Sequence, residues 1–373
     1  MKILNSTTLH GWSAASWYAV EMMGGLAGRG HEIAFLVPDG STAQRAREAG
    51  FTVFTRPDLR AVSGRNAQRV RRELAEIRAD FAPDLILAHA GPDQLWWALV
   101  PGSLPPLVRV RSHDPRPPAA HPLARWLHRR RTAAVFVANE SQRRAYVDRR
   151  LLAPERIRRI PPGFDAGRWR DLPDESARIR SMCGIAPEAT VIASIARFAP
   201  QKDHDTFLAA AAMVAERQAG VHFLIAGYPA ESETASLQAR AAARPALAGR
   251  FAIWDERLTE GRSLVRSADI GVIHSAGSEA ICRVAFEYMA DGIPIVSTEI
   301  GILPEVLHDY RSALLVPPGR PDLLAGAITR LLAVPALRER LRTTAHERLR
   351  SHFSRAGALD RFEEACLSLS ATR

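Results

Sequence analysis

The sequence predicts an α/β protein with two domains, each built around its own parallel sheet. Short apolar, strand-like segments alternate with segments of helical periodicity along all 373 residues. The alternation restarts after a stretch over 160–180 that is rich in Pro, Gly and charge and indicates an interdomain linker. We expect domains at 1–165 and 166–355, with a terminal helix over 356–373 crossing back to the first domain. A ligand is expected in the cleft between two such domains.

Short apolar runs predict five strands in each half of the chain. In the first half the predicted strands are Lys2–Leu4, Glu32–Val37, Leu85–Ala88, Leu107–Val110 and Ala134–Ala138. In the second half they are Val191–Ile195, His222–Ala226, Phe251–Trp254, Ile270–Ile273 and Ile293–Ser297. Helical periodicity predicts, among others, Ser13–Ala27, Asn66–Ile77, Asp205–Ala215, Glu279–Ala290 and a largely helical stretch over Pro321–Leu369.

Composition excludes several classes of protein. A hydrophobic content of 47% excludes intrinsic disorder, and no run approaches the roughly 20 apolar residues of a spanning helix. The opening MKILNS is typical of a first strand and lacks a signal-peptide pattern. Cys183, Cys282 and Cys366 show neither metal-ligand nor disulfide spacing. We therefore expect a cytoplasmic protein without a metal site, either soluble or peripheral on the inner face of the membrane.

The segment Ser275–Thr298 predicts a strand, a turn and a capped helix that bind an anion. Ser278 suits an N-cap and Gly292 suits the residue after a helix end, so free backbone N–H groups would face a ligand. Glu279 and Glu287 are eight residues apart, which on one helix places them near the same side but two turns apart. They could hold separate hydroxyl groups of an extended ligand. The alternative is that Glu279 stabilises the helix dipole and Glu287 is solvated.

Arg197 and Lys202 follow the predicted strand Val191–Ile195. Only Lys2 and Lys202 are lysines among 50 basic residues, so a lysine in this loop is unusual for the chain. An arginine and a lysine beyond the carboxyl end of a strand can hold a diphosphate between two cations. The alternative is an exposed loop with ordinary charges.

Together the motifs of the second half resemble glycosyltransferase family 4, a family of retaining enzymes with the GT-B fold. The resemblance rests on the order and spacing of RFAPQK, FLIAGYP, RSADIGVIHSAGSEAICRVAFEYMADGIPIVST, GILPEVL and ALLVPPG. It implies two Rossmann-like domains whose parallel sheets face each other across a cleft. It also implies sugar transfer, without a metal or other cofactor, from a UDP- or GDP-sugar. The implied acceptor is a glycan or lipid-linked component of the cell envelope, as for lipopolysaccharide and exopolysaccharide glycosyltransferases.

The resemblance implies a role for each residue that matches a family motif. Arg197 and Lys202 would hold the donor diphosphate. Glu287 would bind the ribose hydroxyls, and Glu279 the hydroxyls of the donor sugar. Further donor contacts are implied for Gly11, Gly227, Arg257, Leu258, Ala280, Ile281 and Cys282. The family usually shows glycine after the first Glu and often again two residues later, where this chain has Ala280 and Cys282, so a differently shaped sugar pocket is expected.

The first half is expected to form the acceptor side. Gly11 follows the first strand and would let the backbone approach a ligand closely. Trp12 or Trp17 could stack on a sugar or pack in the core. His113 lies where the family often places an active-site histidine that contacts sugar or acceptor; a loop histidine without a role is the alternative.

Most of the net charge of +10 lies in one window of the first half. Residues 125–159 contain 11 arginines against three acidic residues, a net charge of +8. In HPLARWLHRRR, Leu123, Trp126 and Leu127 are predicted to share one face of a basic amphipathic helix. Such a helix suits an anionic membrane surface or a phosphorylated acceptor, and a solvated arginine-rich face is the alternative. The candidate contact residues are Trp126, Arg129, Arg130 and Arg131.

Two rival functions follow from the same features. A nucleotide-sugar hydrolase or epimerase of this fold would convert the donor without an acceptor. The positive net charge also permits a nucleic-acid-binding protein, but no known nucleic-acid-binding motif occurs in the sequence. The resemblance favours the glycosyltransferase, with no nucleic acid as a partner.

Overall fold

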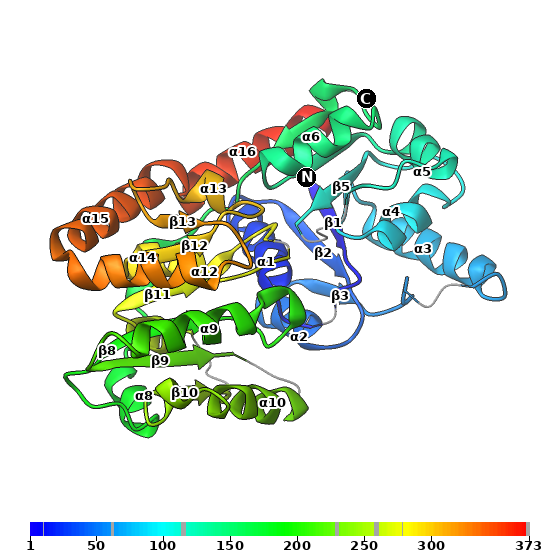
Figure 1. Ribbon diagram of the computed structural model, residues 1–373. Helices are drawn as coiled ribbons and strands as arrows, with labels where there is room; N and C mark the ends of the chain where they lie inside the picture. Colours follow the sequence, from blue (N-terminus) through cyan, green and yellow to red (C-terminus); the bar gives the residue numbers. More distant parts are fainter. Residues whose placement is uncertain are drawn as a thin grey trace. The chain divides into compact units, whose positions relative to one another are not determined.

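The computed structural model describes residues 1–9, 11–60, 63–112, 117–227, 231–256, 261–277 and 279–370. The chain divides into two compact units, one of Met1–Gly163 with Arg355–Arg373 and one of Phe164–Ser354 (Figure 1). Within the described ranges each unit contains one parallel sheet with helices between its strands. The α/β class with two parallel sheets is therefore confirmed.

Unit 1 has seven described strands in the order β3-β2-β1-β4-β5-β6-β7, and all neighbours run parallel. The strands are β1 (Lys2–Ser6), β2 (Glu32–Leu36), β3 (Thr52–Phe54), β4 (Leu85–Ala88), β5 (Leu107–Arg111), β6 (Ala134–Val137) and β7 (Ile157–Arg159). The helices are α1 (Ala14–Ala27), α2 (Ser41–Glu48), α3 (Ala67–Phe81), α4 (Gly91–Ala98), α5 (Pro122–Trp126), the π-helical turn η1 (Leu127–Arg131), α6 (Glu140–Asp148), η2 (Pro154–Arg156) and α16 (Arg355–Ser370).

Unit 2 has six strands among its described residues, in the order β10-β9-β8-β11-β12-β13, again all parallel. The strands are β8 (Thr190–Ile195), β9 (Val221–Ala226), β10 (Phe251–Trp254), β11 (Ile270–Ile273), β12 (Ile295–Thr298) and β13 (Leu314–Val316). The helices are α7 (Ala166–Arg170), α8 (Ser176–Met182), η3 (Pro200–Lys202), α9 (His204–Ala215), α10 (Glu231–Ala242), η4 (Pro245–Leu247), α11 (Arg262–Arg266), α12 (Arg283–Asp291), α13 (Leu303–Val306), α14 (Pro321–Ala333) and α15 (Pro335–His352).

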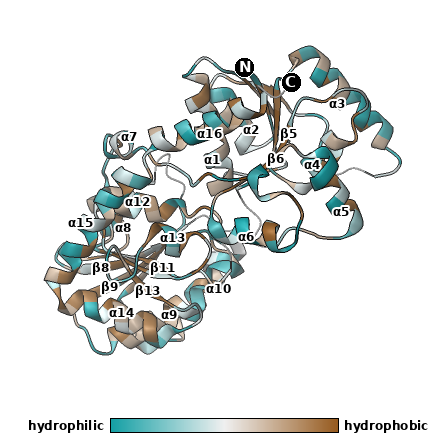
Figure 2. Cartoon of the chain, turned by 90° about the horizontal axis from the view of Figure 1, so that it is seen from above, coloured by the Kyte–Doolittle hydropathy of each residue, from teal (hydrophilic) through white to brown (hydrophobic). Residues whose placement is uncertain are grey.

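Burial follows the hydrophobic pattern of the sequence. The central strands β4 and β11 are buried at every position, which is typical of parallel sheets covered on both faces. Long surface helices bury a single stripe, as α15 does with Leu337, Leu341, Ala345 and Leu349. Figure 2 shows the hydrophobic colouring along the strands and the hydrophilic colouring on many helices. No described helix is both long and apolar enough to cross a membrane.

All ten predicted strands are present within a few residues of their expected ends. The sequence analysis missed β3, β7 and β13, each of three residues, because so short a run cannot display a strand period. The stretch over 160–180, predicted as an interdomain linker, contains the boundary between the units at Gly163 and Phe164, and it also contains α7 and the start of α8. Gly292 ends α12 with a left-handed φ of 65°, as predicted.

The strand order reverses direction at one point in each sheet. In unit 1 the reversal lies between β1 and β4, and in unit 2 it lies between β8 and β11. Loops that leave the carboxyl ends of these adjacent strands diverge and leave room for a ligand. These two edges are therefore where functional side chains are expected to gather.

Candidate active site

The strand reversal in unit 2 brings two segments together that are distant in the sequence. β8 and β11 are hydrogen-bonded neighbours. Arg197 and Lys202 follow β8, whereas Ser275 and Glu279 follow β11. Because parallel strands end at the same edge of a sheet, these four residues lie on loops at that edge.

Lys202, Ser275 and Glu279 form a charged cluster at this edge. Lys202 Nζ forms an ion pair with the Glu279 carboxylate and lies 3.3 Å from Ser275 Oγ, which donates to Glu279 Oε1 at 2.5 Å. The side chains of Lys202 and Glu279 are only 16% and 5% exposed. An ammonium group has three N–H donors, so one remains for an incoming oxyanion. The cluster thus holds a buried cation next to a carboxylate that can accept hydrogen bonds.

The backbone of Glu279 is fixed by the loop after β12. Its carbonyl oxygen accepts a hydrogen bond of 2.7 Å from the Ile302 N–H. Gly301 has a φ of 58°, and a Cβ at that position would lie 2.1 Å from the Glu279 carbonyl oxygen. Thr298 Oγ1 also donates to the Ser275 carbonyl oxygen at 2.8 Å. The GILP segment is therefore packed directly against the backbone of the site.

The prediction that Glu279 and Glu287 share one helix is wrong. α12 begins at Arg283, with Cys282 as its N-cap, so Glu279 precedes the helix. The contacts of Glu279 with Lys202, Ser275 and Ile302 bind both its side chain and its carbonyl group, which prevents the helix from extending backwards. The predicted cap Ser278 lies outside the described residues.

Glu287 lies within α12 and is only 6% exposed, which excludes the solvated alternative. Its Oε1 atom is 2.6 Å from Nε of Arg283, one helical turn earlier. Sequence analysis missed Arg283, although an Arg–Glu pair at (i, i+4) spacing is a recognisable helical signal. Each of the two carboxylates at this edge therefore has its own basic partner.

Buried histidines support the loop that carries Arg197. Burial lowers the pKa of His274 to about 3, so its ring is neutral near pH 7. His274 Nε2 is 2.7 Å from Ser194 Oγ, and the ring stacks on Phe207 with centroids 5.1 Å apart. The pKa of His204 is also lowered, chiefly by burial, and its Nε2 lies 3.3 Å from the Arg197 carbonyl oxygen. The side chain of Arg197 itself is exposed.

The other predicted donor-binding residues of unit 2 that the structure describes are tightly packed or buried. A Cβ on Gly227 would lie 2.0 Å from the Ala196 carbonyl oxygen, so the ends of β8 and β9 can approach only with glycine there. Ala280, Ile281 and Cys282 are buried before α12, and burial raises the pKa of the Cys282 thiol. Arg257, Leu258 and His113 lie outside the described residues.

The corresponding edge of unit 1 carries a buried polar network. His89 Nε2 is 2.8 Å from Asn5 Oδ1, and His89 Nδ1 is 3.2 Å from Ser112 Oγ. All three side chains are buried at or just beyond the ends of β1, β4 and β5. Nothing in the sequence pattern links His89 to the other two residues.

The loop after β1 is held in place by hydroxyl groups. The Gly11 carbonyl oxygen accepts hydrogen bonds from Ser16 Oγ at 2.8 Å and Thr42 Oγ1 at 3.0 Å. A Cβ on Gly11 would meet nothing within 4 Å. Trp17 is buried in the core, and Trp12 lies under Arg45 at 5.5 Å. Core packing is therefore the better interpretation of Trp17.

Asp93 is a titratable group at this edge that the sequence analysis missed. It lies in the first turn of α4, and its Oδ2 accepts a 2.8 Å hydrogen bond from the Ala90 N–H. Burial raises the pKa of Asp93 to about 7. In the sequence, an aspartate near the start of a helix looks like an ordinary capping residue. Only its burial in the folded protein marks Asp93 as a candidate site residue.

The predicted membrane-side arginines lie elsewhere on unit 1. Arg129, Arg130 and Arg131 belong to η1, which leads into the amino end of β6, whereas the polar network lies at the carboxyl ends of its strands. Trp126 is 39% exposed, as a surface contact requires. Leu127 was wrongly assigned to the same exposed face, because it packs into the core of the unit.

Known proteins match both units of the chain. The family model for glycosyl transferases group 1 matches residues 176–348, and the model for Glycosyltransferase Family 4 matches residues 15–168. D-inositol 3-phosphate glycosyltransferase of Segniliparus rotundus is 34% identical over 191 residues, which are 51% of this chain and 41% of that protein. The chain thus spans less than half the length of the curated relatives it matches.

Solved structures show the same fold. A glycosyltransferase from Rickettsia africae superposes with a TM-score of 0.86 at 14% identity, over 99% of this chain and 98% of that one. Anabaena HepE in complex with UDP and glucose gives a TM-score of 0.83 at 18% identity, over 99% and 100% of the two chains. The two parallel α/β units are those of the GT-B fold. The chain belongs to glycosyltransferase family 4.

Proposed function

We propose that this protein transfers a sugar from a nucleotide-sugar donor to a hydroxyl-bearing acceptor with retention of anomeric configuration. The observation that carries the proposal is the buried Lys202–Ser275–Glu279 cluster at the strand reversal of unit 2. A diphosphate leaving group needs fixed positive charge, and a sugar needs hydrogen-bond acceptors. The cluster offers both within one set of contacts.

UDP-sugars are the proposed donors, with GDP-sugars as the second choice. Anabaena HepE, which shares the fold, has been described in complex with UDP and with UDP-glucose. In this chain Glu287 would accept hydrogen bonds from the ribose hydroxyls, while Arg283 orients its carboxylate. Arg197, exposed on the loop after β8, would join Lys202 at the diphosphate.

The proposed reaction exchanges one bond at the anomeric carbon for another. The bond from the anomeric carbon to the phosphate oxygen breaks, and a bond to the acceptor oxygen forms on the same face. The departing phosphate oxygen takes the acceptor proton, so no side-chain base is consumed. Lys202 and Arg197 stabilise the negative charge that develops on the nucleoside diphosphate, without a metal ion. Glu279 orients the donor sugar through its hydroxyl groups.

The proposed acceptor is a glycan or a lipid-linked precursor of the cell envelope, reached from the inner face of the cytoplasmic membrane. The curated relatives are named for D-inositol 3-phosphate, a polyol phosphate, which supports an acceptor rich in hydroxyl groups. The exposed arginines of η1 support a protein that stays peripheral on an anionic surface.

A donor screen tests this proposal directly. The melting temperature of the protein is measured with UDP, GDP, ADP, CMP and their sugars, since a ligand of the native state raises it. We expect UDP or GDP to stabilise the wild type but not Lys202→Ala, and EDTA to have no effect. Lys2→Ala removes the other lysine, which pairs with Glu32 at the surface, and is the matched control.

The rival enzyme is tested in the same samples. Conversion of the donor with no acceptor present, at the rate seen with acceptor, would identify a hydrolase or epimerase. If no nucleotide raises the melting temperature of the protein, the proposed donor site is rejected.

A further inference from the structure

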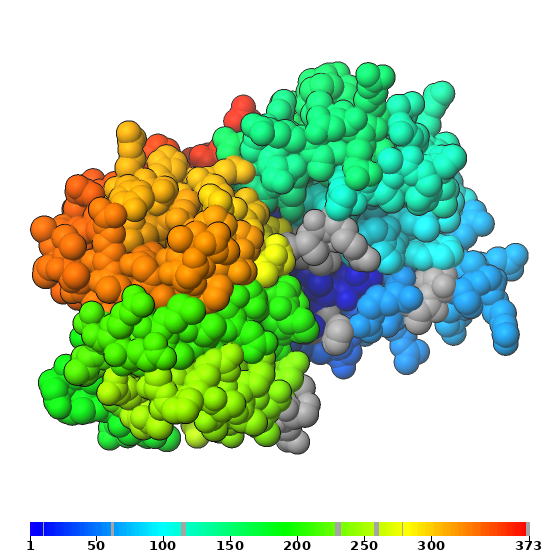
Figure 3. All heavy atoms as spheres, viewed as in Figure 1, coloured from blue at the N-terminus to red at the C-terminus, as the bar shows by residue number. Residues whose placement is uncertain are grey.

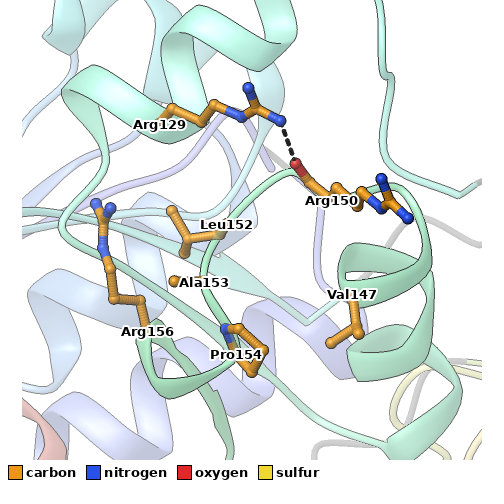
Figure 4. Close-up of a pocket in the computed structure, with 7 residues that line it drawn as sticks. All are labelled: Arg129, Val147, Arg150, Leu152, Ala153, Pro154 and Arg156. Atoms are coloured by element: carbon orange, nitrogen blue, oxygen red, sulfur yellow. Dashed lines mark hydrogen bonds between the residues drawn. The ribbon is translucent and has the colours of Figure 1, made fainter.

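A pocket lies in unit 1, whereas the candidate active site lies in unit 2. It has a volume of about 570 Å³ and is bordered by Arg129, Arg150 and Arg156 around an apolar floor that includes Leu152 and Pro154 (Figure 4). These residues come from η1, from the turn after α6, and from η2 before β7. Arg129 precedes the amino end of β6, and the other lining residues precede the amino end of β7. The pocket is therefore at the opposite edge of the sheet from the Asn5–His89–Ser112 network.

Hydrogen bonds to backbone carbonyl groups fix two of the three guanidinium groups. Arg129 Nη2 donates to the Arg150 carbonyl oxygen at 2.8 Å, and Arg156 donates to the carbonyl groups of Thr132 and Ala133. A guanidinium has five N–H donors, so each keeps several for another acceptor. Carbonyl partners neutralise no charge, and no described carboxylate forms a salt bridge with these three arginines. The rim of the pocket is therefore basic.

Exposed apolar side chains stand next to this charge. Leu123 and Trp126 on α5 are 51% and 39% exposed, among the few large hydrophobic residues at the described surface. α5, which carries Leu123 and Trp126, continues directly into η1, which carries Arg129. Figure 3 shows residues of about 120–160, in teal to green, forming one continuous part of the surface.

Arg125 connects α5, which carries the exposed apolar residues, to the turn that borders the basic pocket. Its Nε donates to the Ala120 carbonyl oxygen at 2.8 Å, and its Nη1 lies 3.4 Å from the Arg149 carbonyl oxygen. Helix α5 is thus tied to the turn that carries Arg150. The apolar pair and the basic pocket form one surface rather than two independent features.

We propose that this pocket binds the phosphodiester group of an anionic membrane lipid while Leu123 and Trp126 enter the interfacial layer. Arginine binds phosphate oxygens in pairs through its planar group. Tryptophan and leucine beside a basic cluster favour the boundary between headgroups and acyl chains. A soluble phosphate compound would use the arginines but would gain nothing from the exposed apolar pair. The inference extends the proposed peripheral location and does not depend on sugar transfer.

The test uses the full chain and sedimentation with vesicles of phosphatidylcholine alone or mixed with phosphatidylglycerol. We expect binding only to the anionic vesicles. Arg129→Gln combined with Arg150→Gln should lower the partition coefficient by about tenfold or more. Arg143→Gln combined with Arg144→Gln is the matched control, because it removes the same charge from α6, where both arginines pair with Glu140. This control should bind within about twofold of the wild type.

Three outcomes would overturn the proposal. Equal losses in the two double variants would show that only diffuse charge matters. An unchanged partition coefficient in the Leu123→Ser/Trp126→Ser double variant would show that these side chains do not enter the membrane, so the proposed lipid is wrong. Stabilisation by inorganic phosphate or glycerol phosphate, lost in the Arg129/Arg150 variant and accompanied by no vesicle binding, would instead identify a site for a soluble phosphate. Nucleotide-induced stabilisation is measured on every variant, so that loss of the donor site is recognised separately.

Discussion

The carboxyl edges of the two sheets have the same topology but opposite chemistry. In unit 2 the strand reversal carries buried ionic pairs, Lys202 with Glu279 and, one helix further, Arg283 with Glu287. In unit 1 it carries the buried Asn5–His89–Ser112 network and a carboxyl group, that of Asp93, whose pKa burial raises to about 7. The strand order leaves room for a ligand at each strand reversal, and the residues of the adjoining loops determine whether that ligand can be an anion. The proposed diphosphate site therefore lies at the first edge.

The largest effect is expected from removing the buried cation of unit 2. Lys202→Ala should lower kcat/KM by about 10²–10³, the range typical for the loss of a fixed donor to developing negative charge. Steady-state transfer assays with Lys2→Ala as the control measure this effect. Because the variant leaves Glu279 buried without its cation, Lys202→Ala/Glu279→Gln should recover thermal stability but not activity. Near-normal turnover in Lys202→Ala would contradict the proposal that the buried cation sets the carboxyl edge of the unit 2 sheet apart from that of unit 1.

A smaller effect is expected at the second ionic pair. Arg283→Leu should raise the donor KM by about tenfold and leave kcat nearly unchanged, because ribose binding contributes equally to ground and transition states. Glu287→Gln should do the same, and the double variant should be no worse than either single variant, since both remove one interaction. A fall in kcat with unchanged KM would instead assign Arg283 to the reacting diphosphate.

The smallest effect concerns the stability of unit 1. Burial raises the pKa of Asp93 from 3.8 to about 7, so the folded protein holds its proton more tightly than the unfolded chain. The stabilisation is complete below pH 3.8 and is lost as the pH rises through about 7. Between about pH 6 and 8 this loss is about 1 kcal/mol. Asp93→Asn keeps an oxygen for the Ala90 N–H and should remove this part of the pH dependence, as urea unfolding at both pH values would measure.

The fold was predictable because its strands are apolar and its helices are periodic. Strands such as Ile270–Ile273 and Phe251–Trp254 were expected with their observed limits, since parallel strands covered on both faces appear as plain apolar runs. The start of α12 was not predictable. Ser278 and Glu279 have the composition of a helix start, and tertiary contacts with Lys202 and Ile302 override that local preference.

The residues of the candidate site that follow a strand or match a family motif were predictable. Arg197, Lys202, Glu279 and Glu287 were singled out by their position after strands and by family spacing. Arg283 has an (i, i+4) signal that the sequence analysis missed, whereas Ser275 was not predictable, because its contact with Glu279 is created only by folding. The same is true of Asp93, whose raised pKa depends on burial by residues distant in sequence.

Gly301 has a consequence for how the sequence of this protein can vary. The close approach of its Cα to the Glu279 carbonyl oxygen means that a side chain at position 301 would displace the backbone of a residue 22 positions earlier. That displacement would move the carboxylate held by Lys202. Positions 279 and 301 are therefore sterically coupled, and a saturation screen should find Gly301 as intolerant of replacement as the charged residues, although it carries no functional group of its own.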